Sequence, residues 1–289
     1  MSFISSYKLG SYTLNGVSLG GLYTAFHIPE IDCLFDVGMA LRSGAGASNL
    51  LLSHAHLDHI GALPSLLGMR GMLNGKKPLK LFCPSSIVEP LKESLSSLST
   101  LHGWPLPLSY HPMCPNDEIQ LRSDVWVRAL KTFHRVPSLG YLLFQRVQKL
   151  KPQYRGRPGA EIRDLKKSGA PIFYSEDRPR VAYLTDTLPE ALKYAPEVLN
   201  AEILILECTF LNEVKPVSTA RAGCHIHIDE LIEWVPHIKN KHLVLMHFSQ
   251  IHKPSEIKTL CNDRLKPLLG DRLTLFLPTP QQRDNSWWI

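Results

Sequence analysis

The chain has 289 residues, with 32 Lys and Arg against 26 Asp and Glu, which gives a formal net charge of +6. It is 44% hydrophobic and 20% charged, a composition that is typical of globular proteins and excludes disordered, collagenous and coiled-coil chains. A chain of this length can bury a full core without disulfides. Because no long Pro/Ser-rich linker interrupts it, we expect residues 1–289 to form a single domain.

The cysteines and the N-terminus indicate the compartment. None of the cysteines forms a Cys-x-x-Cys pair, and such scattered residues are typical of reduced thiols in a cytoplasmic protein. No apolar run approaches the roughly 20 residues that a membrane span needs. Residues 1–8 lack the layout of a signal peptide. We therefore expect a cytoplasmic chain without a membrane anchor, which argues against a periplasmic antibiotic-degrading enzyme.

The first third of the chain shows short apolar segments between turn residues. The pattern predicts strands over 7–14, 23–28 and 33–36, with turns at 15–16, 20–21 and 29. Strands this short and this closely spaced predict antiparallel pairing. A link rich in Gly, Ser and Ala over 43–48 precedes an apolar strand at 49–52, and a helix is expected over about 59–70.

Later segments alternate between strand and helix patterns. Strands are expected over 79–82, 126–130, 141–144, 181–184, 203–206 and 243–246, and helices over 87–98, 228–235 and 254–263. The strands at 203–206 and 243–246 are apolar at every position, which indicates that both of their faces are buried. Helices must therefore cover the sheets, and the sequence predicts a layered α/β fold.

Residues 146–180 differ from the rest of the chain in charge. They contain ten basic and four acidic residues, an excess equal to the net charge of the whole chain. Such a segment is either a solvated insertion or an electrostatic binding surface for a polyanion.

The strongest chemical signal follows the strand at 49–52, where His54, His56, Asp58 and His59 lie within six residues. Three imidazoles and a carboxylate this close together cannot each find a buried partner of their own. A divalent-metal site explains them together. Alternating histidines at a strand end face the same side, and Asp58 and His59 can reach a second position.

Two metal ions would need more ligands than this cluster holds. Three candidates each follow a predicted strand: His134 after 127–133, Asp186 after 181–185 and His247 after 243–246. A site built along one edge of a sheet requires this repeated layout of an apolar strand ending in a ligand-type residue.

These motifs resemble those of the metallo-β-lactamase superfamily, in which two mixed sheets lie between helices in an αββα sandwich, with the metals at one sheet edge. Within it the chain is similar to short-form ribonuclease Z, the tRNA 3′-processing endoribonuclease, from about residue 7 to 277. The most specific stretches are 53–64, 132–134 with 138–141, 206–210, 223–227 and 246–249. Many hydrolases share the ligand set, whereas Glu207 together with His225 indicates the RNA-processing branch.

The resemblance implies two Zn²⁺ ions per chain. It assigns one ion to His54, His56 and His134 and the other to Asp58, His59 and His247, with Asp186 as the bridge. Asp36, which ends the strand at 33–36, matches an aspartate that braces the metal loop without binding metal.

The resemblance also implies a mechanism. Two zinc ions would lower the pKa of a shared water and clamp a phosphodiester for in-line attack. Asp58 would orient that water or take its proton. His225 would protonate the leaving 3′ oxygen, with Glu207 holding the imidazole charged and oriented. The products would be a 3′ hydroxyl on the tRNA and a 5′ phosphate on the trailer.

The basic segment occupies the place of an arm that grips tRNA in bacterial relatives, but it is short, so we expect a shortened arm at about 146–180. Lys149, Lys151, Arg155 and Arg157 are its expected RNA contacts. The family normally pairs two subunits, which implies a homodimer.

Two further features of the sequence stand apart from this assignment. Ile251 and His252 stand where the family usually has Arg and Tyr. Trp287 and Trp288 are candidates for docking on the core or on a second subunit.

The sequence is also compatible with other functions. Another dinuclear metallohydrolase of the same fold, acting on a small phosphodiester, a lactone or a thioester, would need neither the basic segment nor the pair of Glu207 and His225. A non-catalytic RNA-binding relative would be expected to have lost ligands, and here all seven are present. A flavodiiron oxidoreductase would carry a carboxylate in place of His56. We therefore favour the endoribonuclease.

Overall fold

The computed structural model describes residues 4–74 and 77–277, which form two seven-stranded sheets. The first sheet follows the chain order, and its strands are β1 (Ser5–Leu9), β2 (Tyr12–Leu19), β3 (Tyr23–Ile28), β4 (Cys33–Phe35), β5 (Asn49–Leu51), β6 (Leu79–Pro84) and β7 (Leu108–Met113). Its strands pair antiparallel from β1 to β4 and parallel from β4 to β7, so the sheet is mixed.

The second sheet repeats this plan. Its strands, in chain order, are β8 (Glu118–Arg122), β9 (Val125–Lys131), β10 (Leu139–Leu150), β11 (Phe173–Leu184), β12 (Ile203–Glu207), β13 (His242–Met246) and β14 (Leu273–Leu275). The strands from β8 to β11 are antiparallel and those from β11 to β14 are parallel.

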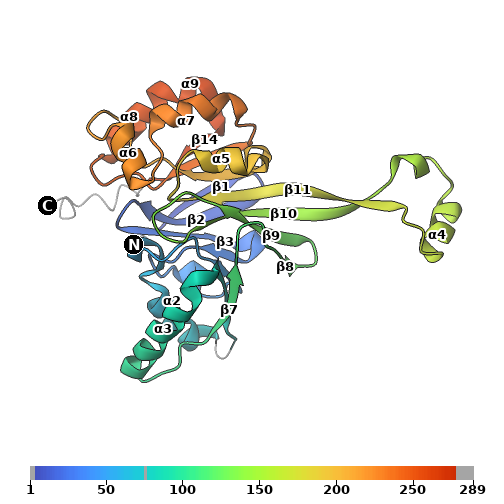
Figure 1. Cartoon of the computed structure of the whole chain (residues 1–289), viewed down its shortest axis with the longest axis horizontal. Coiled ribbons are helices and arrows are strands. Elements are labelled where there is room, and N and C mark those ends of the chain that lie inside the picture. Colours follow the sequence, from blue (N-terminus) through green and yellow to red (C-terminus); the bar gives the residue numbers. More distant parts are fainter. Residues whose placement is uncertain (1–3, 75–76, 278–289) are drawn as a thin grey trace.

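Helices cover the outer face of each sheet, as Figure 1 shows, with α2 and α3 on one side and α5 to α9 on the other. The helices of the described residues are α1 (Leu57–Ile60), α2 (Leu63–Asn74), α3 (Val88–His102), α4 (Gly159–Lys167), α5 (Glu190–Tyr194), α6 (Val217–Gly223), α7 (Ile228–Trp234), α8 (Pro254–Arg264) and α9 (Lys266–Leu269). None of them is long and apolar enough to cross a membrane.

Three apolar clusters hold the two sheets and the two helix layers together. Aromatic side chains such as Phe26, Phe35 and Tyr183 fill the space between the two sheets. A second cluster joins β12 and β13 to α7 and α8, and a third joins β5 and β6 to α2 and α3. The strands expected to be apolar on both faces are buried throughout, which confirms the predicted αββα sandwich with two mixed sheets.

The first predicted strand, over 7–14, is wrong, because the chain turns at Gly10 between β1 and β2. Gly10 has a φ of +58°, a left-handed conformation that favours glycine. The turn predicted at 15–16 is also wrong, since Gly16 lies inside β2. A Cβ at Gly16 would lie 2.3 Å from the carbonyl oxygen of Ala25, so this glycine serves the close approach of β3 rather than a turn.

The helix expected over 59–70 is divided into two. The short helix α1 ends at Gly61, whose N–H donates to the carbonyl of Leu57, and α2 begins at Leu63. The N–H of Ala62 donates instead to the carbonyl of Val37, which ties the break to the end of β4. Asp58 and His59 therefore lie on their own short helix rather than at the start of one long helix.

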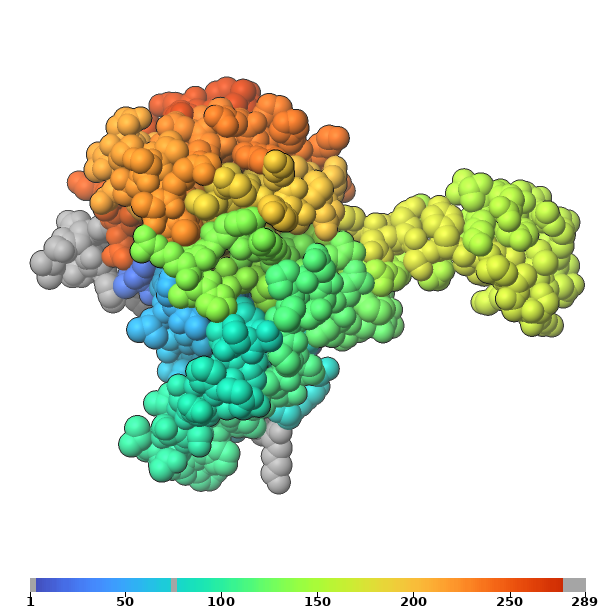
Figure 2. All heavy atoms as spheres, viewed as in Figure 1, coloured from blue at the N-terminus to red at the C-terminus, as the bar shows by residue number. Residues whose placement is uncertain are grey.

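The strands β10 and β11 are three times as long as expected from their apolar ends. Beyond the body they continue as an antiparallel hairpin from the pair of Gln145 and Arg178 to that of Leu150 and Phe173. Charged and polar side chains occupy this part, so it lacks the apolar alternation that marks a half-buried strand. Figures 1 and 2 show that this hairpin projects far from the body and carries α4 at its tip.

Candidate metal centre

The sequence motifs converge at one edge shared by both sheets. His54 and His56 follow β5, His134 follows β9, Asp186 follows β11 and His247 follows β13. These strands belong to two different sheets, and the face-to-face packing of the sheets brings their ends together.

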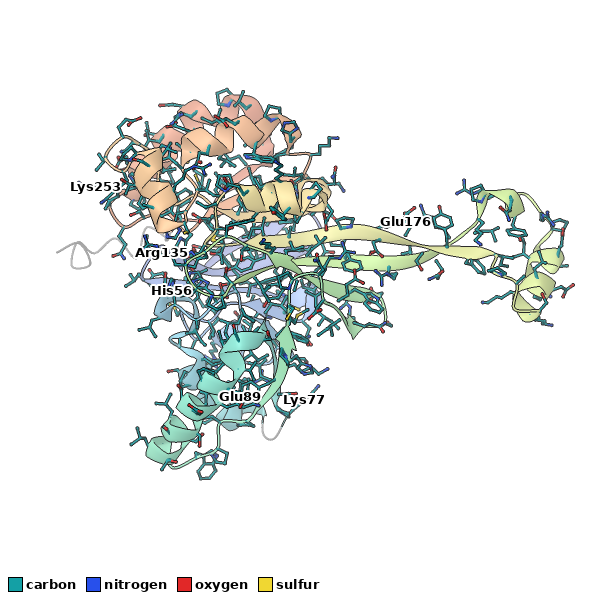
Figure 3. All side chains as sticks on the ribbon, in the orientation of Figure 1. His56, Lys77, Glu89, Arg135, Glu176 and Lys253 are labelled. Carbon is teal, nitrogen blue, oxygen red and sulfur yellow. The ribbon has the colours of Figure 1, made fainter. Side chains whose placement is uncertain are left out.

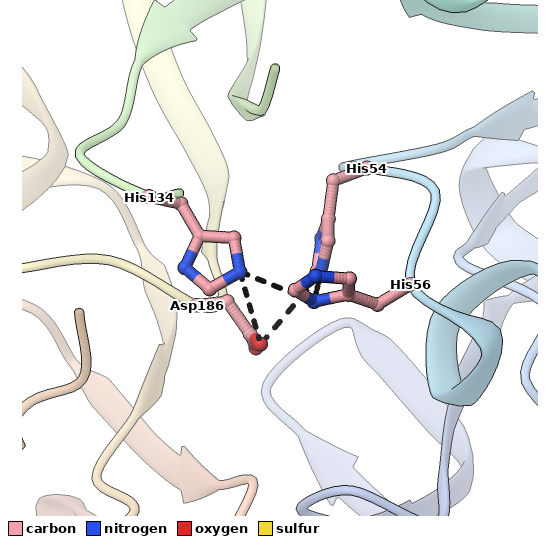
Figure 4. A group of neighbouring side chains, drawn as sticks. All are labelled: His54, His56, His134 and Asp186. Atoms are coloured by element: carbon pink, nitrogen blue, oxygen red, sulfur yellow. Dashed lines mark hydrogen bonds and ion pairs between the residues drawn. The ribbon is translucent and has the colours of Figure 1, made fainter. Parts of the chain in front are cut away.

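One group consists of His54, His56, His134 and Asp186, drawn in Figure 4, with one candidate ligand atom from each lying within 4.8 Å of the others. The Nδ1 atom of His56 lies 3.1 Å from Nε2 of His54 and 3.2 Å from Nε2 of His134. The imidazole nitrogens therefore point at a common space rather than at separate partners.

A second group consists of Asp58, His59 and His247. The two imidazoles approach through their Nε2 atoms at 3.3 Å, and Oδ2 of Asp58 lies 3.5 Å from each of these nitrogens. His247 has a φ of +62°, which is rare for a residue with a side chain. This backbone strain turns the ring into the pocket directly after β13, and such strain is common at functional sites.

Asp186 lies between the two groups with one carboxylate oxygen directed at each. Its Oδ2 is 3.6 Å from Nε2 of His54 and 3.9 Å from Nε2 of His134. Its Oδ1 is 3.3 Å from Nε2 of His59 and 3.1 Å from Nε2 of His247. This is the placement required of a carboxylate that bridges two cations.

The hydrogen bonds behind the second group test whether it suits a cation. Nδ1 of His59 bonds to the Asp36 carboxylate at 2.7 Å, so it carries the ring proton and leaves a lone pair on Nε2. The Thr209 hydroxyl donates to Glu207 at 2.6 Å and therefore accepts from Nδ1 of His247 at 3.0 Å. In the neutral rings two lone pairs thus face each other beside a carboxylate, and positive charge between them, from a proton or a metal cation, relieves this repulsion.

Hydrogen bonds behind the first group orient His54 in the same way. The Ser53 hydroxyl donates to Asp36 at 2.8 Å and accepts from Nδ1 of His54 at 3.0 Å, which leaves the lone pair of His54 Nε2 directed into the pocket. The donor set of imidazole nitrogens and carboxylate oxygens suits a divalent transition metal such as zinc. The residues present therefore fit the metal that the fold implies.

The charge of the pocket also favours cations. Burial raises the pKa of Asp186, but the neighbouring His247 and His59 outweigh it and hold this pKa well below its ordinary value. Burial likewise raises the pKa of Asp58, and hydrogen bonds from His247 and His59 reverse the effect. Both carboxylates are thus anionic at neutral pH and attract positive charge.

The pair of Glu207 and His225 lies beside this pocket. Nδ1 of His225 is 3.1 Å from Oε1 of Glu207, and the His225 ring contacts the rings of His134 and His247. Burial lowers the pKa of His225, but the Glu207 carboxylate outweighs it and raises this pKa to about 9. His225 is therefore a charged imidazole at neutral pH, with its Nε2 free to donate a proton.

Several residues that hold this site in place were not singled out from the sequence. The fully buried Glu207 also accepts the N–H of Thr187 at 2.9 Å and the hydroxyl of Thr209. The hydroxyl of Tyr183 donates to Asp36 at 2.6 Å. In the sequence, Thr187 and Thr209 are marked only by their positions, shortly after a strand end that carries a candidate ligand or an acidic residue. A hydroxyl at such a position does not by itself indicate that it orients a site residue.

We expect Asp36→Asn to lower the affinity for Zn²⁺ by roughly 10- to 100-fold, because a neutral amide cannot hold the ring proton of His59 and the hydroxyl proton of Ser53 as the carboxylate does. Asp32→Asn is the matched control. Asp32 also has a positive φ and accepts a backbone N–H, from Ser48, but contacts no histidine of the site. Calorimetric titration of both apo variants with Zn²⁺ measures the difference, and equal affinities would remove the bracing role of Asp36.

The fold and the site define a hydrolase of the metallo-β-lactamase type, and residues 31–248 match the family described as beta-lactamase superfamily domain. The chain is 36% identical over 253 residues to tRNase Z TRZ2, chloroplastic, of Arabidopsis thaliana, covering 87% of this chain and 71% of the relative. It is 33% identical over 265 residues to tRNase Z TRZ1 of the same plant, covering 91% of this chain and 94% of the relative.

Among solved structures, human tRNase Z, short form, superposes with a TM-score of 0.55 at 20% identity, covering 82% of this chain and 92% of the human chain. The likeness supports the fold. The two plant relatives agree with the resemblance inferred from the motifs. The chain belongs to the ribonuclease Z family of metal-dependent endoribonucleases.

Proposed function

We propose that the chain removes 3′ trailers from precursor tRNA, leaving a 3′ hydroxyl on the tRNA and a 5′ phosphate on the trailer. The observation that carries this proposal is the Glu207–His225 pair at 3.1 Å, in ring contact with the two histidines His134 and His247 of the candidate metal pocket. A small-ester hydrolase would not need this pair. The names of the plant relatives point to the same substrate.

We assign Zn²⁺ as the resident metal, two ions per chain. His54, His56 and His134 would hold one ion, Asp58, His59 and His247 the other, and Asp186 both. When bound, zinc supplies an acidified water and a positive clamp on the phosphodiester. Asp58, which also accepts the backbone N–H of Gly21 at 2.9 Å, is held where it can orient that water or take its proton.

His225 acts as the general acid in this proposal. The leaving group is the 3′ oxygen of ribose, a poor leaving group that departs more readily when protonated. Glu207 keeps the proton on Nδ1 and the ring positively charged, so that Nε2 faces the substrate with a proton to give. Such a positioned acid contributes roughly 10²- to 10⁴-fold to the rate.

Residues 146–180 would act as an RNA-binding arm of this single-domain enzyme. Two of its four proposed contacts are paired with acids: Lys149 lies 2.6 Å from Glu176 on the hairpin, and Arg157 lies 2.5 Å from Glu161 on α4. Figure 3 labels Glu176 on the projecting hairpin. Within residues 4–74 and 77–277, no ion pair involves Lys151 or Arg155. The charge available to RNA is therefore concentrated at the tip.

We expect Lys151→Gln combined with Arg155→Gln to raise the KM for precursor tRNA and to reduce the slope of log K against log salt by about one for each lost phosphate contact. The matched control is Lys149→Gln combined with Arg157→Gln, which removes equal charge from a lysine and an arginine side chain that are already paired with acids. Steady-state kinetics between about 50 and 200 mM salt compare them. If both pairs alter cleavage of a small phosphodiester as strongly as that of RNA, the arm is structural.

The remaining parts of the proposal concern assembly and location. We propose a homodimer, as the family resemblance implies, and light scattering at micromolar concentration tests it. We also propose a cytoplasmic location, which the scattered cysteines without a Cys-x-x-Cys pair support. Trp287 and Trp288 lie outside the described residues.

Incubation of the purified protein with a 3′-extended precursor tRNA, beside bis(p-nitrophenyl) phosphate and a lactone, tests the proposed activity. We expect cleavage of the precursor at the junction of tRNA and trailer, with a 5′ phosphate on the released trailer. Cleavage of the small substrates alone would favour another metallohydrolase of the same fold.

A further inference from the structure

An exposed cluster of two aromatic rings and a lysine lies next to the metal pocket. The Lys131 ammonium lies over the Phe133 ring at 5.1 Å and over the Tyr194 ring at 4.8 Å, and the two ring centroids are 5.1 Å apart. Tyr194 is 61% exposed. In the described part of the chain Lys131 has no ion pair and the Tyr194 hydroxyl has no hydrogen bond. The exposed surface of this cluster is thus a positively charged aromatic face.

This cluster is fixed relative to the pocket through the backbone. Phe133 directly precedes His134, its N–H donates to the Thr187 hydroxyl at 2.9 Å, and its carbonyl accepts the N–H of Leu188 at 3.3 Å. Thr187 follows Asp186, the residue between the two ligand groups. Tyr194 ends α5, a few residues further along the same segment. The backbone of Phe133 is therefore tied to the segments that carry two proposed metal ligands, His134 and Asp186.

A second cation lies on the other side of His134. Arg135 is exposed, and its guanidinium donates to the carbonyl of Ala222, at the end of the helix that precedes His225. Arg135 directly follows His134, whose ring contacts that of His56 at 4.9 Å, and Figure 3 labels Arg135 near His56. A guanidinium has five N–H donors, so this single contact leaves donors for a phosphate.

We propose that Lys131, Phe133 and Tyr194 form a stacking subsite for one nucleobase of the RNA strand beside the scissile phosphate, with Arg135 contacting a neighbouring phosphate. This inference rests on the proposed function, since it requires an RNA substrate. Every base has a π face that stacks on an exposed aromatic ring regardless of sequence, and a nearby cation strengthens binding of an anionic strand. The subsite would hold the strand so that the scissile bond enters the pocket.

The test compares Tyr194→Ala with Tyr194→Phe on precursor tRNA. The alanine variant should raise KM by roughly 5- to 100-fold, the cost of losing one stacked base. The phenylalanine variant keeps the ring and should stay close to the wild type, because the hydroxyl has no described partner. Cleavage of bis(p-nitrophenyl) phosphate, which has no nucleobase, should change far less. Trp104→Ala is the control, since Trp104 is a 68% exposed aromatic residue that lies outside the site.

Substrates with a single abasic nucleotide decide whether stacking is the cause. At one position next to the cleavage site, the abasic substrate should bind the wild type as weakly as Tyr194→Ala binds the intact one, and the two changes should not add. An unchanged KM for Tyr194→Ala, or additive losses at every position, would overturn the subsite alone. A wild type that does not cleave precursor tRNA would overturn the proposed function and this inference with it.

Discussion

Asp186→Ala is expected to remove both metals together and to lower cleavage of precursor tRNA and of bis(p-nitrophenyl) phosphate alike by roughly 10³-fold or more. The physical reason is the placement of one carboxylate between two groups of ligands, with Oδ2 near His54 and Oδ1 3.1 Å from Nε2 of His247. Losing it removes a ligand from each group and leaves the two cations without the negative charge that lies between them.

Elemental analysis of protein purified without chelator measures this effect. The wild type should contain about two zinc ions per chain, and Asp186→Ala close to none. His56→Ala is the comparison, because His56 belongs to one group only and its loss should release about one ion. Retention of one tightly held ion by Asp186→Ala would contradict the bridging role, and iron as the main metal of the wild type would contradict the assignment of zinc.

His225→Ala is expected to lower kcat on precursor tRNA by on the order of 10²-fold or more while most activity on bis(p-nitrophenyl) phosphate remains. The ribose oxygen needs a proton to leave, whereas nitrophenolate leaves without one. Glu207→Gln should show the same selectivity in a milder form, because Glu207 orients and charges the imidazole at 3.1 Å without touching the substrate.

The zinc content of His225→Ala separates two roles. His225 also lies close enough to Asp186 and His247 for the three to form a possible ligand group. If the variant keeps both ions and loses activity on RNA selectively, the side chain is a proton donor. If it loses an ion and both substrates suffer equally, the side chain is a ligand and the general-acid role is wrong.

The sequence by itself determined the layered α/β fold and the positions of the metal-type residues. The motif of His54, His56, Asp58 and His59 lies within six residues, and the other three candidate ligands each directly follow a predicted strand. Such signals are local. A buried strand is recognised by the apolar side chains along its own length, and a candidate ligand by its position directly after that strand. The αββα architecture followed from these motifs through resemblance, and the structure confirms it.

Only the tertiary structure decided which atoms face each other. The direction of each Asp186 oxygen, the relay from Asp36 through Ser53 to His54 and the ring contact of His225 with His247 depend on strand ends from two sheets that are distant in sequence. The sequence predicted an arm at about 146–180, but only the structure shows the antiparallel hairpin that carries it and the cluster of Lys131, Phe133 and Tyr194. Polar hairpins and exposed rings carry no apolar periodicity, so their arrangement is set by cross-strand pairs and packing between elements rather than by local pattern.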